Sequence, residues 1–170
     1  MKIALIYSSL TGNTEKIAKA ILSVLPANTD CIKLCGIKKP DLKNYDLLIL
    51  GTWIDKGTAD PFILELAKDI KDKKIVFFFT LGAYPDSKHA DDCTMNLTEL
   101  FTKNGNLVLG NYHCQGAVDP KLIEKFKRLP ADHPHALTDE RLKRYEEAAK
   151  HPDEKDMNKA KQFIKNLNVV

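Results

Sequence analysis

The chain has 170 residues, of which 44% are hydrophobic and 29% are charged, and its formal net charge is +3 at pH 7. This length suits one domain, residues 1–170, and the composition excludes a disordered chain. The charge is mild and forms no basic stripe with interleaved aromatic residues, which argues against nucleic-acid binding. No apolar run approaches the ~18 residues that a membrane span needs.

The N-terminal segment and the cysteines together predict a cytoplasmic protein. The apolar stretch 3–7 is too short for a signal peptide and has no cleavage site after it. The four cysteines, Cys31, Cys35, Cys93 and Cys114, are scattered along the chain. We therefore expect free thiols, with neither a disulfide framework nor a metal site.

Apolar strands alternate with amphipathic helices from the first residue onward. We expect strands at residues 2–7, 30–34, 45–51, 74–80 and 107–112, and helices at 13–25, 62–70 and 91–103. The helix between the second and third strands is replaced by a turn near residues 38–40. Strands that are apolar throughout are typical of a parallel sheet covered on both faces. The pattern predicts a doubly wound α/β fold.

The last third of the chain reads as helical. We expect helices at 120–127, 138–150 and 154–166, of which the last carries an apolar face suited to packing on the sheet. Residues 114–150 then form a helical insertion between the fifth strand and the closing helix.

The segment between the first strand and the first helix carries the strongest functional signal. It consists of Ser8, Ser9, Leu10, Thr11, Gly12, Asn13 and Thr14. Here the unpaired N–H groups of a helix N-terminus and several hydroxyls could surround an anion, although such clusters also serve as ordinary helix caps. The segment lacks the lysine of a nucleoside-triphosphatase loop and two of the three glycines of a dinucleotide loop. What remains is a monophosphate site made of neutral donors.

The stretch Ser9-Leu10-Thr11-Gly12-Asn13-Thr14 matches the T/S-x-T-G-x-T pattern of the flavodoxin phosphate loop. On this motif the chain resembles the flavodoxin family. The resemblance extends over about residues 2–112 and the closing helix. It implies a five-stranded parallel sheet of order 2-1-3-4-5 and FMN as the cofactor.

Two further loops support the resemblance and complete the predicted FMN site. In flavodoxins the loop after the third strand carries an aromatic residue over the flavin ring and a flexible residue near flavin N5; here it supplies Thr52, Trp53, Ile54 and Gly57. The loop after the fourth strand supplies Thr80, Leu81, Gly82, Ala83 and Tyr84, whose backbone amides would meet the pyrimidine edge. Trp53 either stacks on the ring or is a half-buried core residue, and Tyr84 either stacks on the outer face or caps its loop.

The function that the resemblance implies is electron transfer between redox partner proteins, a reductase and an acceptor enzyme. The alternative is an FMN-dependent NAD(P)H oxidoreductase acting on a quinone or another small acceptor, and a receiver-like module is disfavoured because Ser8-Ser9 stand where receivers need paired acidic residues. Flavodoxins are usually acidic, whereas this sequence has a pI near 8.6, so its partner should be acidic or dock by apolar contact.

The insertion is foreign to the short-chain flavodoxin pattern. It could cover a flavin edge and present Cys114, Gln115 or His113 to a substrate or partner, although a free cysteine such as Cys114 is more often a small buried apolar group than a reactive thiol. Arg141 and Tyr145 either face the flavin or simply pack.

Overall fold

Five parallel strands form the sheet, in the order β2-β1-β3-β5-β6. The computed structural model describes residues 1–36, 39–130, 132–133 and 135–168. The strands are β1 (Ile3–Tyr7), β2 (Asp30–Lys33), β3 (Leu47–Asp55), β5 (Lys74–Leu81) and β6 (Leu107–Gln115), and a two-residue β4 (Thr58–Ala59) pairs antiparallel with the end of β3. The predicted five-stranded order is confirmed. Of the turn expected near residues 38–40, Lys38 lies outside the described residues.

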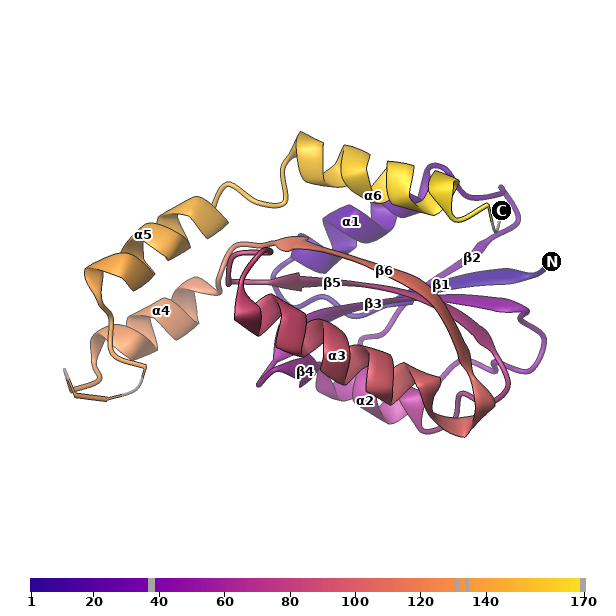
Figure 1. The fold of residues 1–170 in the computed structure, drawn as a ribbon, viewed down its shortest axis with the longest axis horizontal. Coiled ribbons are helices and arrows are strands. Elements are labelled where there is room, and N and C mark those ends of the chain that lie inside the picture. The colour runs from indigo at the N-terminus through magenta and orange to yellow at the C-terminus, as the bar shows by residue number, and fades with distance from the viewer. Residues whose placement is uncertain (37–38, 131, 134, 169–170) are drawn as a thin grey trace.

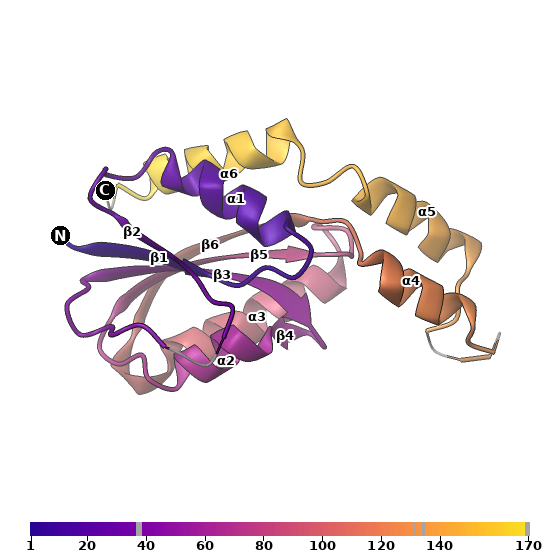
Figure 2. The same cartoon turned by 180° about the vertical axis from the view of Figure 1, so that it is seen from behind.

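Helices cover both faces of this sheet. The α-helices are α1 (Asn13–Leu22), α2 (Pro61–Ala67), α3 (Lys88–Thr102), α4 (Pro120–Lys127), α5 (Asp139–Ala148) and α6 (Glu154–Asn166), of which α1, α2, α3 and α6 cover the sheet (Figure 1). Figures 1 and 2 show α1 and α6 on one face and α2 and α3 on the other. Two apolar clusters follow this division, since Ile21 and Ile164 pack on one side of the sheet and Leu66 and Phe101 on the other.

Local signals explain where these helices begin. Asp60 caps α2 and is followed by Pro61 at the first helical position, one residue before the predicted start. The start of α3 is earlier than predicted, because the Ser87 side chain accepts a hydrogen bond from the N–H of Ala90. Asp91 then lies in the first turn of α3, where a negative charge is favourable.

The β3–β4 hairpin was not predicted. Lys56 (φ 49°) and Gly57 (φ 81°) form its two-residue turn, and both have the positive φ that tight hairpins require. A strand of two residues has no periodicity that a sequence reading could detect. The hairpin extends β3 to Asp55, and Trp53 is thereby held next to Thr80 of β5.

The inserted helices α4 and α5 lie beyond the carboxyl ends of the strands, outside the two helical layers (Figure 1). β6 continues to Gln115, three residues farther than expected, so the helical segment begins after it. Within the described residues no helix is both long enough and apolar enough to span a bilayer.

Candidate functional site

The loop between β1 and α1 is shaped by Gly12, which caps α1 in a left-handed conformation (φ 92°). An L side chain is strained there, so the glycine is a local requirement. The Ser9 hydroxyl accepts hydrogen bonds from the N–H groups of Gly12 (3.1 Å) and Glu15 (3.3 Å). The N–H groups of Asn13 and Thr14 belong to the first helical turn, for which the helix itself supplies no acceptor. The loop therefore presents donors and a positive dipole end.

Two hydroxyls of this segment belong to the buried framework below it. Thr14 Oγ1 lies 3.0 Å from Thr80 Oγ1, which joins the start of α1 to the end of β5. Ser8 is buried and bonds to the carboxyl of Asp60. These contacts tie the loop to the strands on either side of it.

Asp60 is the buried acidic residue of this framework. Its carboxylate accepts hydrogen bonds from the Thr52 hydroxyl (2.8 Å) and from the N–H of Phe62 (2.9 Å). Burial raises the pKa of the Asp60 carboxyl, and the hydrogen bonds from Thr52 and Ser8 oppose the rise. Asp60 also caps α2, whereas its contact with Thr52 of β3 depends on the tertiary fold.

The two loops after β3 and β5 lie on either side of one cavity of about 460 Å³. From the predicted site it is lined by Leu10, Thr11, Asn13, Trp53, Ile54, Thr80, Leu81, Gly82, Ala83 and Tyr84. Trp53 is half-buried and Tyr84 is 39% exposed, so both aromatic rings can reach a ligand. Ser8, Ser9, Gly12, Thr14, Thr52 and Gly57 do not line the cavity. Gly57 is at the hairpin turn, where its carbonyl accepts from Asn96 (2.9 Å).

The segment after β6 closes one side of this cavity. Asn13 donates both to Thr11 Oγ1 (3.0 Å) and to the carbonyl of Ala117 (2.8 Å), which joins the phosphate loop to the start of the insertion. A Cβ at Gly116 would lie 2.9 Å from Asn13 Nδ2, so only glycine permits this approach. Gly82 is packed just as closely, because a Cβ added there would lie 2.5 Å from Val118 Cγ2.

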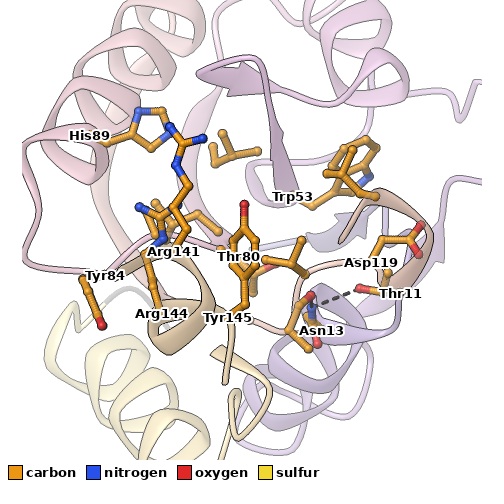
Figure 3. Close-up of a pocket in the computed structure, with 18 of the residues that line it drawn as sticks. Thr11, Asn13, Trp53, Thr80, Tyr84, His89, Asp119, Arg141, Arg144 and Tyr145 are labelled. Carbon is orange, nitrogen blue, oxygen red and sulfur yellow. Dashed lines mark hydrogen bonds between the residues drawn. The ribbon is translucent and has the colours of Figure 1, made fainter. Parts of the chain in front are cut away.

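The inserted helices and the start of α3 supply more of the lining, the latter through Ser87 and His89. Leu122 and Phe126 come from α4, His135 from the connection, and Arg141, Arg144 and Tyr145 from α5. Figure 3 shows Tyr145 near the middle of the view, with the two arginines toward His89 and Tyr84 and with Trp53 and Asn13 on the other side. The sequence offered the choice that Arg141 and Tyr145 face the site or pack; both line the cavity.

The chain matches the flavodoxin domain family over residues 4–165. It is 34% identical, over 99% of its length and 97% of the relative's, to the flavodoxin-like domain-containing protein BilS of Clostridioides difficile. It is 30% identical to a flavodoxin of Buchnera aphidicola over 65% of this chain and 69% of that protein. This chain belongs to the flavodoxin family.

Solved structures agree with this assignment at the level of the fold. Oxidised flavodoxin 2 from Bacillus cereus superposes with a TM-score of 0.62 at 19% identity, covering 98% of this chain and 97% of that one. A Lactobacillus acidophilus flavoprotein in complex with FMN gives a TM-score of 0.54 at 18% identity, over 73% of this chain and 97% of that one.

Membership of the flavodoxin family confirms the predicted cofactor class and general activity. The chain is an FMN-binding electron-transfer flavoprotein, and flavodoxins pass electrons to redox partner proteins.

Cys114 is confirmed as a small buried group and not a reactive thiol, whereas the expectation that the insertion presents Gln115 to a substrate or partner is wrong. Both belong to β6 and are buried, with Cys114 2% and Gln115 3% exposed. Burial raises the pKa of the Cys114 thiol well above its ordinary value, so the sulfur is an inert core group. His113 is half-buried, and its Nε2 lies 2.9 Å from the carbonyl of Pro85. The error arose because β6 is longer than its apolar pattern indicated.

Proposed function

We propose that FMN binds in the cavity described above, with its phosphate at the Ser8–Thr14 loop and its ring between the loops that follow β3 and β5. The observation that carries this proposal is that a single cavity is lined by residues of all three loops. Its volume lies in the range of ~300–1,000 Å³ that small-ligand pockets span. In this fold, residues of these three loops already lie together around the cavity.

The hydrogen-bond donors of this loop fit a single phosphate group. A helix N-terminus, the Ser9 and Thr11 hydroxyls and the Gly12 turn provide neutral donors, and no lysine is present within the loop. Such a site suits a monophosphate dianion, because a polyphosphate would need cationic groups to balance its further charge. Ser8, Thr14 and Thr52 support this loop through Asp60 and Thr80, so they act by holding its shape.

The remaining residues position and shield the ring. Trp53, half-buried at the end of β3, offers a flat apolar face that excludes water from one side of a ring. Backbone amides of Leu81, Gly82 and Ala83, at the end of β5, provide donors in the cavity lining, and Tyr84 offers a second aromatic face. When bound, FMN supplies the redox chemistry by taking up and releasing one or two electrons.

We further propose that the protein carries electrons between a reductase and an acceptor enzyme in the cytoplasm, where its four free cysteines stay reduced. The basic side chains of α4, Lys121, Lys125 and Lys127, favour a partner with an acidic docking surface. Such a partner would be drawn to this protein by charges opposite in sign to those of the usual acidic flavodoxins.

Two measurements test these proposals. The freshly purified protein should be yellow, and the flavin released from it should be FMN. Anaerobically, the protein alone should oxidise NAD(P)H slowly and become reduced rapidly only when a separate flavoprotein reductase is added. A colourless protein that ignores micromolar FMN would refute the site. Fast NAD(P)H oxidation by the protein alone would show that it is an oxidoreductase and not an electron carrier.

A further inference from the structure

The helical insertion, residues 114–150, forms part of the wall of the proposed flavin cavity. α4 and α5 contribute six of the residues that line it when the connection between them is included: Leu122, Phe126, His135, Arg141, Arg144 and Tyr145. The inference that follows rests on the proposed function, because it concerns how these residues act on FMN in that cavity.

The insertion brings an excess of positive charge to the cavity. Arg141 and Arg144 are its two guanidinium groups, and Asp119 is the carboxylate in the lining. Asp119 is already engaged as the cap of α4, where it accepts from the N–H of Lys121 (2.9 Å). Arginine stays protonated at any physiological pH, so both positive charges are permanent.

Arg144 is the more informative of the two arginines. Its guanidinium carbon lies 5.5 Å from the centroid of the Tyr145 ring, so the two side chains form one surface. Among the residues that the structure describes, Arg144 Nε is buried and has no hydrogen-bond partner. A buried donor without a partner is costly and rare, and a ligand that supplies an acceptor is one explanation of it. Arg141 is held in place by donating Nη1 to the carbonyl of Ala136 (2.9 Å).

The position of the arginines decides which part of FMN they affect. In Figure 3 they lie across the cavity from Thr11 and Asn13 of the phosphate loop. The phosphate and the ring are the two ends of FMN, so a charge far from the phosphate loop acts mainly on the ring. The oxidised ring is neutral, whereas the two-electron-reduced ring readily loses a proton and becomes an anion. A fixed positive charge attracts the anion and leaves the neutral ring almost unaffected.

We propose that Arg144, with Arg141 beside it, is a flavin-binding residue whose charge makes this protein favour reduced FMN over oxidised FMN. The insertion then has a defined role in a flavodoxin-type protein: it raises the potential at which the bound flavin is reduced. The two effects are linked, because a ligand state that is bound more tightly is formed more easily on the protein.

The experiment compares four full-length proteins loaded with FMN. They are the wild type, Arg144→Gln, Arg144→Lys and Lys143→Gln, the last removing an exposed positive charge from the same helix outside the cavity lining. The two-electron midpoint potential is measured by anaerobic dithionite titration against a reference dye. The affinity for oxidised FMN is measured separately, by titrating flavin-free protein and following the quenching of flavin fluorescence.

We expect Arg144→Gln to lower the preference for reduced over oxidised FMN by about three- to tenfold, as one partly solvated unit charge would. This corresponds to a midpoint potential lower by about 15 to 30 mV, since a tenfold change is about 30 mV for two electrons. Arg144→Lys should keep most of the wild-type potential, and Lys143→Gln should match the wild type. The difference between wild type and Arg144→Gln should shrink in high salt.

The outcomes separate this inference from the proposed function. If the wild type binds FMN but Arg144→Gln shifts the potential no more than Lys143→Gln does, the inference is wrong and the proposed site stands. An equal loss of affinity for both redox states would likewise refute the preference for reduced flavin. If no FMN binds to the wild type, the proposed site itself fails.

Discussion

The sheet with its four covering helices and the inserted pair α4–α5 are built in different ways. In the sheet, Leu5, Ile49 and Phe77 are fully buried, and each covering helix adds buried side chains. α4 has no buried residue, and α5 has only Ala148. Yet the insertion contributes apolar, aromatic and arginine side chains to the cavity lining. The comparison teaches that stability resides in the sheet, whereas the insertion alters the ligand environment.

The largest effect expected from this comparison is on stability. Phe77 is fully buried and packs on Phe101 with ring centroids 5.3 Å apart. We expect Phe77→Ala to lower the free energy of unfolding by about 3–5 kcal/mol. Leu142→Ala, on the 38% exposed Leu142 of α5, should change it by less than about 0.5 kcal/mol. Urea denaturation measures both. Equal losses would mean that the insertion shares the core of the sheet.

A smaller effect is expected at the phosphate loop. Gly12→Ala leaves the space around the residue unchanged, since nothing lies within 4 Å of an added Cβ, but it forces an L side chain to φ 92°. The cost of about 1–2 kcal/mol should appear in the free energy of unfolding and as weaker FMN binding in calorimetric titration. Gly36→Ala is the matched control, with open space and no positive φ. Wild-type FMN affinity in Gly12→Ala would argue against phosphate binding at this loop.

The smallest effect on stability is expected at His151, which connects the insertion to α6. The carbonyl of His151 accepts from the N–H of Ala117 (3.1 Å), and its ring Nδ1 lies 2.6 Å from Asp156 Oδ2. The bond with Asp156 raises the pKa of His151. A raised histidine pKa contributes stability that is complete below its unfolded value of about 6.5 and is lost as the pH rises through the higher folded value.

The test at this residue is the pH profile of thermal unfolding. The wild type should lose stability relative to His151→Gln as the pH rises above about 6.5, because only the wild type has a ring that loses its proton there. The two proteins should converge at the alkaline end. Parallel profiles across this range would show that the ion pair does not couple the insertion to the sheet.

Much of the fold could be predicted because its signals are local. The apolar runs indicated all five parallel strands, and the helices expected from residues 13, 120 and 154 begin at those residues. The errors lie where local pattern and structure diverge. β4 is too short to have a period, and the polar residues of β6, up to Gln115, hid the length of that strand. A strand buried by its neighbours can carry polar side chains that a sequence reading assigns to a loop.

The candidate site divides in the same way. Residue types and spacing between β1 and α1 pointed to a phosphate loop, because helix N-termini and glycine geometry are properties of neighbouring residues. The contact of Asn13 with Ala117 joins residues 104 positions apart, and no spacing rule predicts it. The sequence also left open whether Arg141 and Tyr145 of α5 face the flavin or simply pack, since both fit the amphipathic pattern of this helix.

By itself, the sequence therefore determined the parallel sheet and FMN as the cofactor, and it predicted a flavodoxin-type phosphate loop. Only the tertiary structure decided that Asp60 ties Thr52 and Ser8 together, that Cys114 is buried, and that Arg144 faces the cavity. The physical reason is range: backbone geometry and helix dipoles act within a few residues, whereas burial and charge at a site depend on how distant segments pack.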